Sequence, residues 1–326
     1  MSAGETTVSV VIVSWNTRAY LEQCLGSLTS DVCAYPMEIL VVDNGSTDGS
    51  VECVKERFPH VRLIQSGSNL GFAKANNLGL ARCAGKYICL INSDVTVLKD
   101  CITRLVDFCE AHPEVGMVGP RVMGADGKLQ RSCRGFPSIW NMTCRAFGLD
   151  SAFPRVAAFS GHFLRHWSQE DQREVDILSG CFWVVRRTAL DQVGPLDESF
   201  FMYGEDMDWC RRFWARGWRL TFVPQAEAIH YGGASSANAP VRFFIEKQRA
   251  DLQYWEKHHG WLARQVYFAV SCLNHLLRIF AYACLWIIRP AESGEQHFKM
   301  VRSFQCLRWM FSSLVSSNRL SGQTGQ

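Results

Sequence analysis

The sequence predicts an α/β fold in which a mostly parallel sheet is flanked by helices. Short runs of apolar and β-branched residues alternate with segments whose apolar residues recur at helical spacing. The runs are almost continuously apolar, as is typical of parallel strands buried on both faces. Their connections are short, which favours right-handed crossovers. Beyond residue 260 the alternation gives way to long amphipathic segments, so we expect a C-terminal amphipathic helical tail.

Five strands and their connecting helices are predicted in the first half of the chain. Leu21, Leu25 and Leu28 lie at i, i+4 and i+7 and mark the first helix. Similar spacing predicts helices at 51–58 and 102–109, and residues 69–74 open another helix that runs through Leu80. The predicted strands are Val8–Val13, Glu38–Val42, Val61–Ile64, Tyr87–Ile91 and Val115–Val118.

Polar residues follow four of these strands. Ser14 and Asp43 follow the first and second strands, and Asn69 and Asp94 follow the third and fourth. The carboxyl ends of parallel strands open on one crevice, where ligands of such sheets bind. Turn formation or helix capping would explain each polar loop separately. Their coincidence at four strand ends favours a ligand site, and Asp94 offers oxygens to a hard divalent cation.

The second half of the chain is less regular. Residues 132–172 have no clear period and predict a long, partly irregular lid or binding loop, with a disordered insertion as the alternative. A strand at Cys181–Val185, a helix ending at Gly217 and a strand at Arg219–Val223 follow. We therefore expect one domain over residues 1–260, with a nucleotide-binding half at 1–131 and an acceptor-side half at 132–260. The tail occupies 261–326.

Acidic residues gather at the start of the helix that precedes Gly217. Glu205, Asp206 and Asp208 follow an aromatic cluster there. Acids in a first turn are favoured by the helix dipole, but a carboxylate aimed into the crevice would also serve as a general base. His230 ends an apolar stretch before two glycines. It is either a structural residue or a metal ligand.

Composition and missing motifs exclude several classes of protein. The net charge of +3 over 326 residues does not indicate a nucleic-acid partner. The 14 cysteines show no Cys-x-x-Cys pair and the N-terminus no basic-then-apolar signal segment, so we expect a reduced, cytosolic environment. Residues 14–18, Ser-Trp-Asn-Thr-Arg, contain no glycine. A dinucleotide-binding dehydrogenase, a nucleotide hydrolase and a sugar nucleotidyltransferase would each need a glycine-rich loop.

The motifs, taken in order, resemble those of the inverting glycosyltransferases of family 2, which use the Rossmann-like GT-A fold. Residues 43–50, Asp-Asn-Gly-Ser-Thr-Asp-Gly-Ser, look like that family's nucleotide-binding loop, and Asn92-Ser93-Asp94 is similar to its Asp-x-Asp metal motif. Glu205-Asp206 looks like its catalytic pair. The closer resemblance is to the rhamnosyltransferase-like branch, through residues 69–79, 200–208 and 223–230.

This resemblance implies roles for individual residues. Asp43 would hydrogen-bond the pyrimidine ring, and Asn92 and Asp94 would face the ribose and diphosphate. Asp94 would bind Mg²⁺ or Mn²⁺ together with His230. Asn92 stands where many relatives carry Asp, which removes one charge from the metal motif. The residues expected to bind the nucleotide sugar are Val13, Ser14, Asp43, Asn44, Asn69, Gly71, Lys74, Asn77, Asn92, Ser93 and Asp94.

The resemblance also implies the reaction. Asp206 would be the base that deprotonates the acceptor hydroxyl, with Glu205 or Asp208 as alternatives because sequence alone does not aim a side chain. Displacement with one base and no covalent intermediate inverts the anomeric centre. dTDP-rhamnose is the donor that the resemblance favours, with a UDP-sugar as the alternative. The implied acceptor is a polyprenyl-diphosphate-linked saccharide of cell-envelope synthesis. A non-catalytic nucleotide-sugar-binding scaffold is the hypothesis from another class.

The tail predicts peripheral attachment to the cytoplasmic face of the cell membrane. Seven basic and two acidic residues give 261–326 a charge of +5, leaving about −2 for residues 1–260. Val266–Ile288 is apolar enough to span a membrane, yet Ser271, Asn274, His275 and Arg278 share one helical face. That stripe favours a helix lying in the interface. The alternative is a helical hairpin packed on the domain or on a second copy of the chain.

Overall fold

The computed structural model describes residues 7–30, 33–233, 240–288 and 293–321. The chain forms two compact units, which we call the sheet unit (Met1–Phe136 and Trp167–Asn238) and the helical unit (Pro137–His166 and Ala239–Gln326). The predicted tail residues 289–292 and 322–326 lie outside the described residues. Each unit is described separately below.

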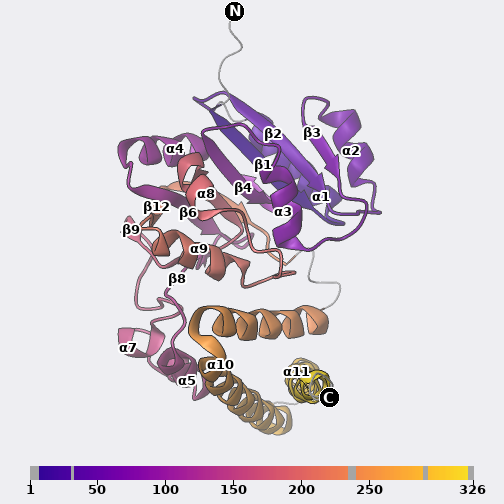
Figure 1. Cartoon of the computed structure of the whole chain (residues 1–326), viewed down its shortest axis with the longest axis vertical. Helices are drawn as coiled ribbons and strands as arrows, with labels where there is room; N and C mark the ends of the chain where they lie inside the picture. Colours follow the sequence, from indigo (N-terminus) through magenta and orange to yellow (C-terminus); the bar gives the residue numbers. More distant parts are fainter. Residues whose placement is uncertain (1–6, 31–32, 234–239, 289–292, 322–326) are drawn as a thin grey trace, which may run out of the picture. The chain divides into compact units, whose positions relative to one another are not determined.

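The sheet unit is built on one large sheet (Figure 1). Its strands are β1 (Val8–Ser14), β2 (Met37–Asp43), β3 (Arg62–Gln65), β4 (Tyr87–Asn92), β5 (Val95–Val97), β6 (Val115–Met123), β7 (Leu129–Gln130), β9 (Arg173–Glu174), β11 (Phe182–Arg186) and β12 (Arg219–His230), and β8 (Cys133–Arg134) pairs separately with β10 (Ile177–Leu178). Its helices are α1 (Arg18–Ser30), α2 (Ser50–Arg57), α3 (Phe72–Leu80), α4 (Cys101–Ala111), α8 (Arg187–Val193) and α9 (Glu205–Ala215).

The strand order β3-β2-β1-β4-β11-β6-β12-β5 confirms the predicted sheet and adds an antiparallel component. β3, β2, β1 and β4 are parallel neighbours, so their carboxyl ends share one edge. β11 lies antiparallel between β4 and β6, and β5 is antiparallel to β12. The sequence does not predict β5, because three residues carry too little periodicity to identify a strand.

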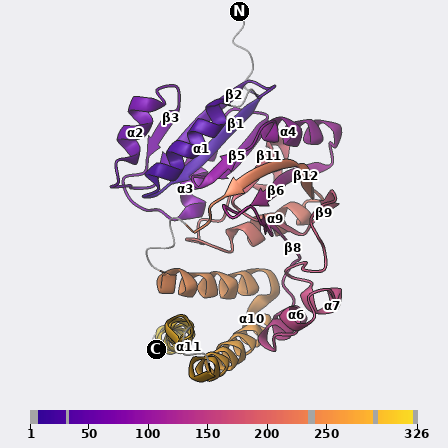
Figure 2. The same ribbon diagram turned by 180° about the vertical axis from the view of Figure 1, so that it is seen from behind.

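Helices cover both faces of the sheet (Figures 1 and 2). Val8, Val10 and Ile12 alternate onto the face covered by α1 and α4, where they join the main core. Val11 points to the opposite face, where a Cβ added at Gly79 of α3 would lie 2.3 Å from its Cγ1 atom. Strands buried on both faces explain the continuous apolar runs in the sequence.

β12 continues seven residues beyond the predicted end at Val223. Pro224 cannot donate to a ladder, and the pairing with β6 shifts register between Val223 and Glu227. This bulge accommodates the proline and lets the strand extend to His230. Its last residues pair with β5 in the register Val95↔His230. The extension therefore delivers His230 to the turn that follows β4.

The helical unit includes part of the segment predicted to be an irregular lid. Its helices are α5 (Ile139–Ala146), α6 (Leu149–Ala152), α7 (Ala157–Ser160), α10 (Pro240–Ile288) and α11 (Ser293–Ser321). α5 packs on α10, and α10 packs on α11. The chain thus divides after Phe136 and before Ala239, and not after residues 131 and 260. Gly260 is a kink within α10, with φ of 81°.

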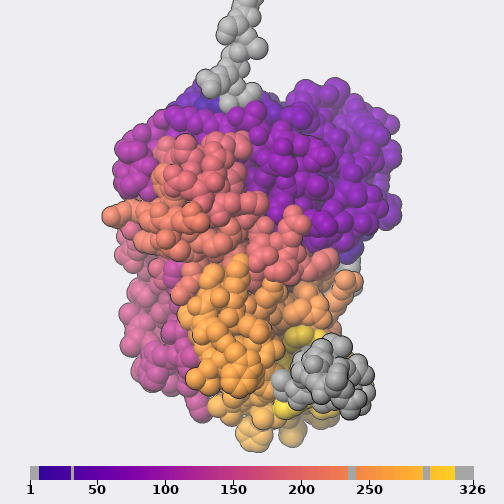
Figure 3. Space-filling model, viewed as in Figure 1, coloured from indigo at the N-terminus to yellow at the C-terminus, as the bar shows by residue number. Residues whose placement is uncertain are grey.

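Two members of the polar stripe on α10, Ser271 and His275, face inward. Ser271 and His275 are 5% and 3% exposed, whereas Leu276 and Phe280 are 57% and 71% exposed. Gln248, on the other side of the kink, contacts both buried polar residues. α10 also contains a stretch that is long and apolar enough to cross a membrane. In Figure 3, α10 (orange) forms much of the visible face of this unit.

Candidate active site

The carboxyl ends of β1, β2 and β4 place four predicted residues side by side. The parallel register pairs Ser14 with Asp43 and Val13 with Asn92. The backbone N–H of Asn44 donates to the Ser14 carbonyl at 2.8 Å. Strand order reverses between β1 and β4, the position where open α/β sheets bind ligands. The site therefore begins at this edge.

Two loops at this edge hold each other. The Asn16 side-chain oxygen accepts from the Thr47 N–H at 2.8 Å, and the Asn16 N–H donates to the Ser46 hydroxyl at 3.0 Å. Asn16 adopts a left-handed conformation with φ of 52°, which asparagine tolerates better than most residues. Both carboxylate oxygens of Asp43 accept from the Ser46 N–H at 3.3 Å. These contacts fix the position of the Asp43 carboxylate.

Asn44 holds the protein rather than presenting a free amide. Its nitrogen donates to the Asn69 side-chain oxygen at 3.1 Å and to the Gly71 carbonyl at 3.3 Å. Its oxygen accepts from the Leu70 N–H at 2.9 Å. The side chain is 3% exposed. Asn44 thus shapes the segment 69–71.

A loop before α9 closes against the start of α3. The Phe72 N–H donates to the Phe201 carbonyl at 2.7 Å. Gly71 has φ of +84°, and a Cβ there would lie 2.4 Å from the Phe201 carbonyl oxygen, so only glycine allows this approach. The Asn77 side chain binds the backbone of Leu196 at 2.9 and 3.1 Å. Asn77 therefore positions the loop, whereas Lys74 in the first turn of α3 is exposed.

The turn after β4 brings Asp94 and His230 together. The Asp94 Oδ1 and His230 Nε2 atoms are 3.3 Å apart, and the Tyr231 N–H donates to the Asp94 carbonyl at 2.9 Å. Asp94 is 7% exposed. Next to it, the Ser93 hydroxyl lies 2.8 Å from the Thr17 hydroxyl. Residues 136 positions apart in the sequence thus form one carboxylate–imidazole pair.

Gln130 determines which nitrogen of His230 carries a proton. Its amide nitrogen donates to the His230 carbonyl at 2.9 Å, so its oxygen faces His230 Nδ1 at 2.8 Å. Nδ1 must donate to that oxygen. Nε2 then either carries a second proton toward Asp94 or presents a lone pair. A lone pair and a carboxylate facing the same point fit a divalent cation between them.

At this point two side chains, Asp94 and His230, could coordinate a metal ion. Within the described ranges, no group of three or more His, Cys, Asp or Glu side chains could hold a metal ion. Mg²⁺ is commonly held by one or two protein carboxylates together with substrate phosphates and water. The donor set of Asp94 and His230 therefore fits a metal that is bound together with a diphosphate.

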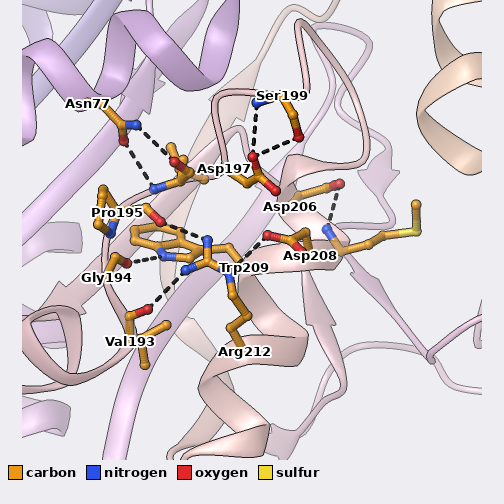
Figure 4. Close-up of polar contacts among 12 residues, drawn as sticks. Asn77, Val193, Gly194, Pro195, Asp197, Ser199, Asp206, Asp208, Trp209 and Arg212 are labelled. Atoms are coloured by element: carbon orange, nitrogen blue, oxygen red, sulfur yellow. Dashed lines mark hydrogen bonds and ion pairs between the residues drawn. The ribbon is translucent and has the colours of Figure 1, made fainter. Parts of the chain in front are cut away.

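The three carboxylates at the start of α9 have different surroundings, and Figure 4 shows those of Asp206 and Asp208. Asp208 is fully buried and accepts from Arg212 Nε at 2.9 Å. Arg212 also donates to the carbonyls of Val193 and Pro195. Glu205 is 6% exposed. Asp206 is only partly buried, and one of its oxygens accepts from the Met207 N–H at 2.9 Å.

Buried thiols connect the surroundings of Asp94 and Asp206. Burial, reinforced by the charge of Asp94, raises the pKa of Cys181 to about 11. Burial also raises the pKa of Cys210, with contributions from Asp206 and Cys133. The pKa of Cys133 is raised to about 12 by burial, and Cys181 adds to the effect. The charge of Asp94 thus acts on the buried thiol of Cys181, and the charge of Asp206 acts on that of Cys210.

Three contributors to this site are not among the predicted residues. Gln130 lies in a two-residue strand without a recognisable motif, so nothing in the sequence indicates its contact with His230. Thr17 bridges Ser14 and Ser93 at 3.0 and 2.8 Å. Its position in the loop after the first strand is the one signal that would indicate it. Tyr231 follows a predicted residue but acts through its backbone N–H.

The fold and the site together define the class of protein. The parallel strands have the order β3-β2-β1-β4 and end in polar residues, and α9 begins with acidic residues. This is the arrangement of a GT-A glycosyltransferase. A mannosyltransferase from Pyrobaculum calidifontis, solved with GDP-Man and Mn²⁺, shares the fold with a TM-score of 0.52 at 18% identity, over 93% of this chain and 87% of that one. TarS 1–349 of S. aureus gives 0.51 at 15% identity, over 95% and 92%.

The family model described as Glycosyl transferase family 2 matches residues 9–194. The chain is 32% identical over 264 residues to an N-acetylglucosaminyl-diphospho-decaprenol L-rhamnosyltransferase of Mycobacterium tuberculosis H37Rv, covering 77% of this chain and 85% of the relative. It is 26% identical to the rhamnosyltransferase WbbL of Escherichia coli K12, over 69% and 83%. The chain therefore belongs to glycosyltransferase family 2, and its relatives include rhamnosyltransferases, as predicted.

Proposed function

We propose that this enzyme transfers rhamnose, with inversion, from dTDP-rhamnose to a polyprenyl-diphosphate-linked saccharide, using a divalent metal ion. The observation that carries the proposal is the Asp94–His230 pair beside the carboxyl end of β4, with the histidine tautomer set by Gln130. A relative that is 32% identical is named for the same type of transfer, to N-acetylglucosaminyl-diphospho-decaprenol. This name supports both the donor sugar and the lipid-linked acceptor.

The donor would lie across the ends of β1, β2 and β4. Asp43, whose carboxylate is held by the Ser46 N–H, would accept from the N–H of a pyrimidine ring. Asn92, Ser93 and Asp94 follow along the same edge toward His230. A Mg²⁺ or Mn²⁺ ion, when bound, neutralises charge that develops on the departing diphosphate. Asp94 and His230 would hold it.

Asp206 is the carboxylate best suited to act as the base. Asp208 is closed off by its ion pair with Arg212, and protonating it would leave the partly buried Arg212 guanidinium without its charged partner. Glu205 is buried against the protein. Asp206 remains partly accessible, and a single backbone N–H holds one of its oxygens. It would accept the proton of the acceptor hydroxyl as that oxygen attacks the anomeric carbon.

The outward-facing apolar residues of the helical unit are suited to an acceptor that is linked to a lipid. Trp261, Leu262, Phe280, Ile287 and Ile288 are 65–73% exposed on α10. Large exposed apolar surfaces mark interaction or membrane sites. We propose that α10 and α11 contact the cytoplasmic face of the membrane, where a lipid-linked acceptor would be found.

The test is transfer from dTDP-rhamnose, and from UDP-sugars for comparison, to a synthetic polyprenyl-diphosphate N-acetylglucosamine with Mn²⁺. Asp206→Asn should lower transfer by about 10²–10⁴-fold while dTDP binding with Mn²⁺ is retained. Asp191→Asn, an exposed aspartate on α8, is the matched control and should keep full activity. Full activity of the Asp206 variant would remove it from the base role. A product that retains the anomeric configuration would refute the one-base mechanism.

A further inference from the structure

Three arginines in the helical unit act on one buried histidine. Arg145 comes from α5, Arg278 from α10 and Arg302 from α11. We call them the arginine cluster. Burial and the charges of these three residues lower the pKa of His275 to about 4, so this 3%-exposed imidazole is neutral near pH 7. α5 and α11 both pack on α10, so the three arginines come from helices that are in contact.

Aromatic rings support the cluster. The guanidinium of Arg302 lies 4.3 Å from the centre of the Phe244 ring, and the His275 ring lies 5.7 Å from the same ring. Arg278 donates to the Tyr282 hydroxyl at 3.1 Å. Stacking and a neutral hydroxyl hold the guanidinium groups in place without neutralising their charge.

Among the described residues, no carboxylate forms an ion pair with the cluster, although Asp251 of α10, which accepts from the Tyr267 hydroxyl at 3.1 Å, contributes a negative charge to the same surroundings. In the described part of the chain, none of its three arginines lies within ion-pair distance of an acidic side chain, and the buried Nε atoms of Arg278 and Arg302 have no hydrogen-bond partner. Burial and the charge of Arg278 lower the pKa of Arg302. By contrast, Arg249 on the same α10 pairs with Glu246 at 3.2 Å.

Partly buried cations without a counter-charge are unfavourable. A chain that only needed to pack these helices would be more stable with apolar or neutral residues here. An arrangement that is unfavourable alone but strongly positive is what a binding site for an anion requires. Guanidinium groups present parallel N–H donors that match the oxygens of a phosphate group.

We propose that the arginine cluster binds the diphosphate group of a prenyl-type lipid, with Arg278 and Arg302 donating to its oxygens. Leu276 and Phe280 flank Arg278 on α10 and are 57% and 71% exposed. They offer an apolar surface beside the anion site, as an amphiphile with a charged head and a hydrocarbon chain requires. The proposal rests on the proposed function, because it assigns the lipid diphosphate of the acceptor to the helical unit.

The test uses the full chain in EDTA, so that a metal-dependent donor site does not take up the probe. The probes are inorganic pyrophosphate, measured by calorimetry, and phosphatidylcholine vesicles containing a small fraction of farnesyl diphosphate. Arg302→Gln and Arg278→Gln should each weaken binding of both probes by about tenfold or more. Arg249→Gln is the matched control and should bind like wild type. Thermal stability of Arg302→Gln should stay unchanged or rise, because repulsion with Arg278 is removed.

Two outcomes would overturn the proposal. In one, Arg302→Gln, Arg278→Gln and Arg249→Gln bind both probes as wild type does. In the second outcome, pyrophosphate does not bind, and vesicles with farnesyl diphosphate bind no better than vesicles with phosphatidylglycerol at the same charge. This result would indicate general attraction to an anionic surface. Binding of dTDP with Mn²⁺ is measured on the same variants. Its absence in wild type would refute the proposed function without affecting the pyrophosphate result.

Discussion

Gln130→Leu is the most specific test of the carboxylate–imidazole pair. The Gln130 amide makes two hydrogen bonds to His230, at 2.8 Å to Nδ1 and 2.9 Å from its own nitrogen to the carbonyl. Leucine has a similar volume but cannot accept from Nδ1, so the imidazole loses the contact that selects its tautomer and orientation. The backbone pairing of Gln130 with Val122 does not depend on the side chain and should remain.

The expected loss of Mn²⁺ affinity follows from the role of Gln130, which orients a metal ligand. Removing such a partner lowers metal affinity by about 10–100-fold, which corresponds to about 1.4–2.7 kcal/mol. Gln130→Glu keeps an acceptor for Nδ1 but loses the donor to the His230 carbonyl, so its Mn²⁺ affinity should lie between those of wild type and Gln130→Leu. His230→Ala should lose more affinity than Gln130→Leu, since it removes the ligand itself.

The assay is a titration of Mn²⁺ with the protein and dTDP present, in which the free ion is followed by electron paramagnetic resonance. Gln225→Leu is the matched control, because Gln225 is exposed on the same strand as His230. Wild-type Mn²⁺ affinity for Gln130→Leu, alongside a clear loss for His230→Ala, would refute the assignment of the tautomer to Gln130. Wild-type affinity for both variants would refute the metal site.

Two further predictions concern stability. Gly71→Ala places a Cβ 2.4 Å from the Phe201 carbonyl at a φ of +84°, so it should lower the free energy of unfolding in urea by about 2–4 kcal/mol. Gly26→Ala, where no atom lies within 4 Å of the new Cβ, should be neutral or stabilising, and equal stability of the two variants would contradict the steric argument. The pKa of His275 is lowered from 6.5 to about 4 in the folded state, so the unfolded state binds the proton first as the pH falls. The free energy of unfolding should therefore decrease between pH 6.5 and pH 4, by about 3 kcal/mol in total. His275→Gln should lose this part of the pH dependence of urea unfolding, and an unchanged profile would show that His275 is not held neutral.

Much of the fold could be predicted because its signals are local. Residues 10–13, Val-Val-Ile-Val, form an unbroken apolar run, and such a run before a polar turn is sufficient to predict a buried parallel strand. The predicted polar strand ends Ser14 and Asp43 are neighbours in the register. Neighbouring parallel strands have their carboxyl ends at the same edge of the sheet, so residues at these ends lie close together.

The interactions that the sequence does not predict are those that are not local. Asn44 has the residue type and position of a ligand contact, but its amide is occupied by residues 69–71. Ser271 and His275 belong to a polar stripe, yet they face the interior of the helical unit. A helical period shows that polar and apolar residues lie on different faces of a helix. It does not show which of the two faces packs against another element.

By itself, the sequence determined the α/β class, the strand ends and the ordered motifs of family 2, because these depend on residues close together in the chain. Only the tertiary structure decided that β5 pairs with β12 and brings His230 to Asp94, that Gln130 selects the imidazole tautomer, and that Arg212 occupies Asp208 while Asp206 stays accessible. The physical reason is that hydrogen bonds and ion pairs between distant segments depend on packing, whereas periodicity reports only how one segment could be buried.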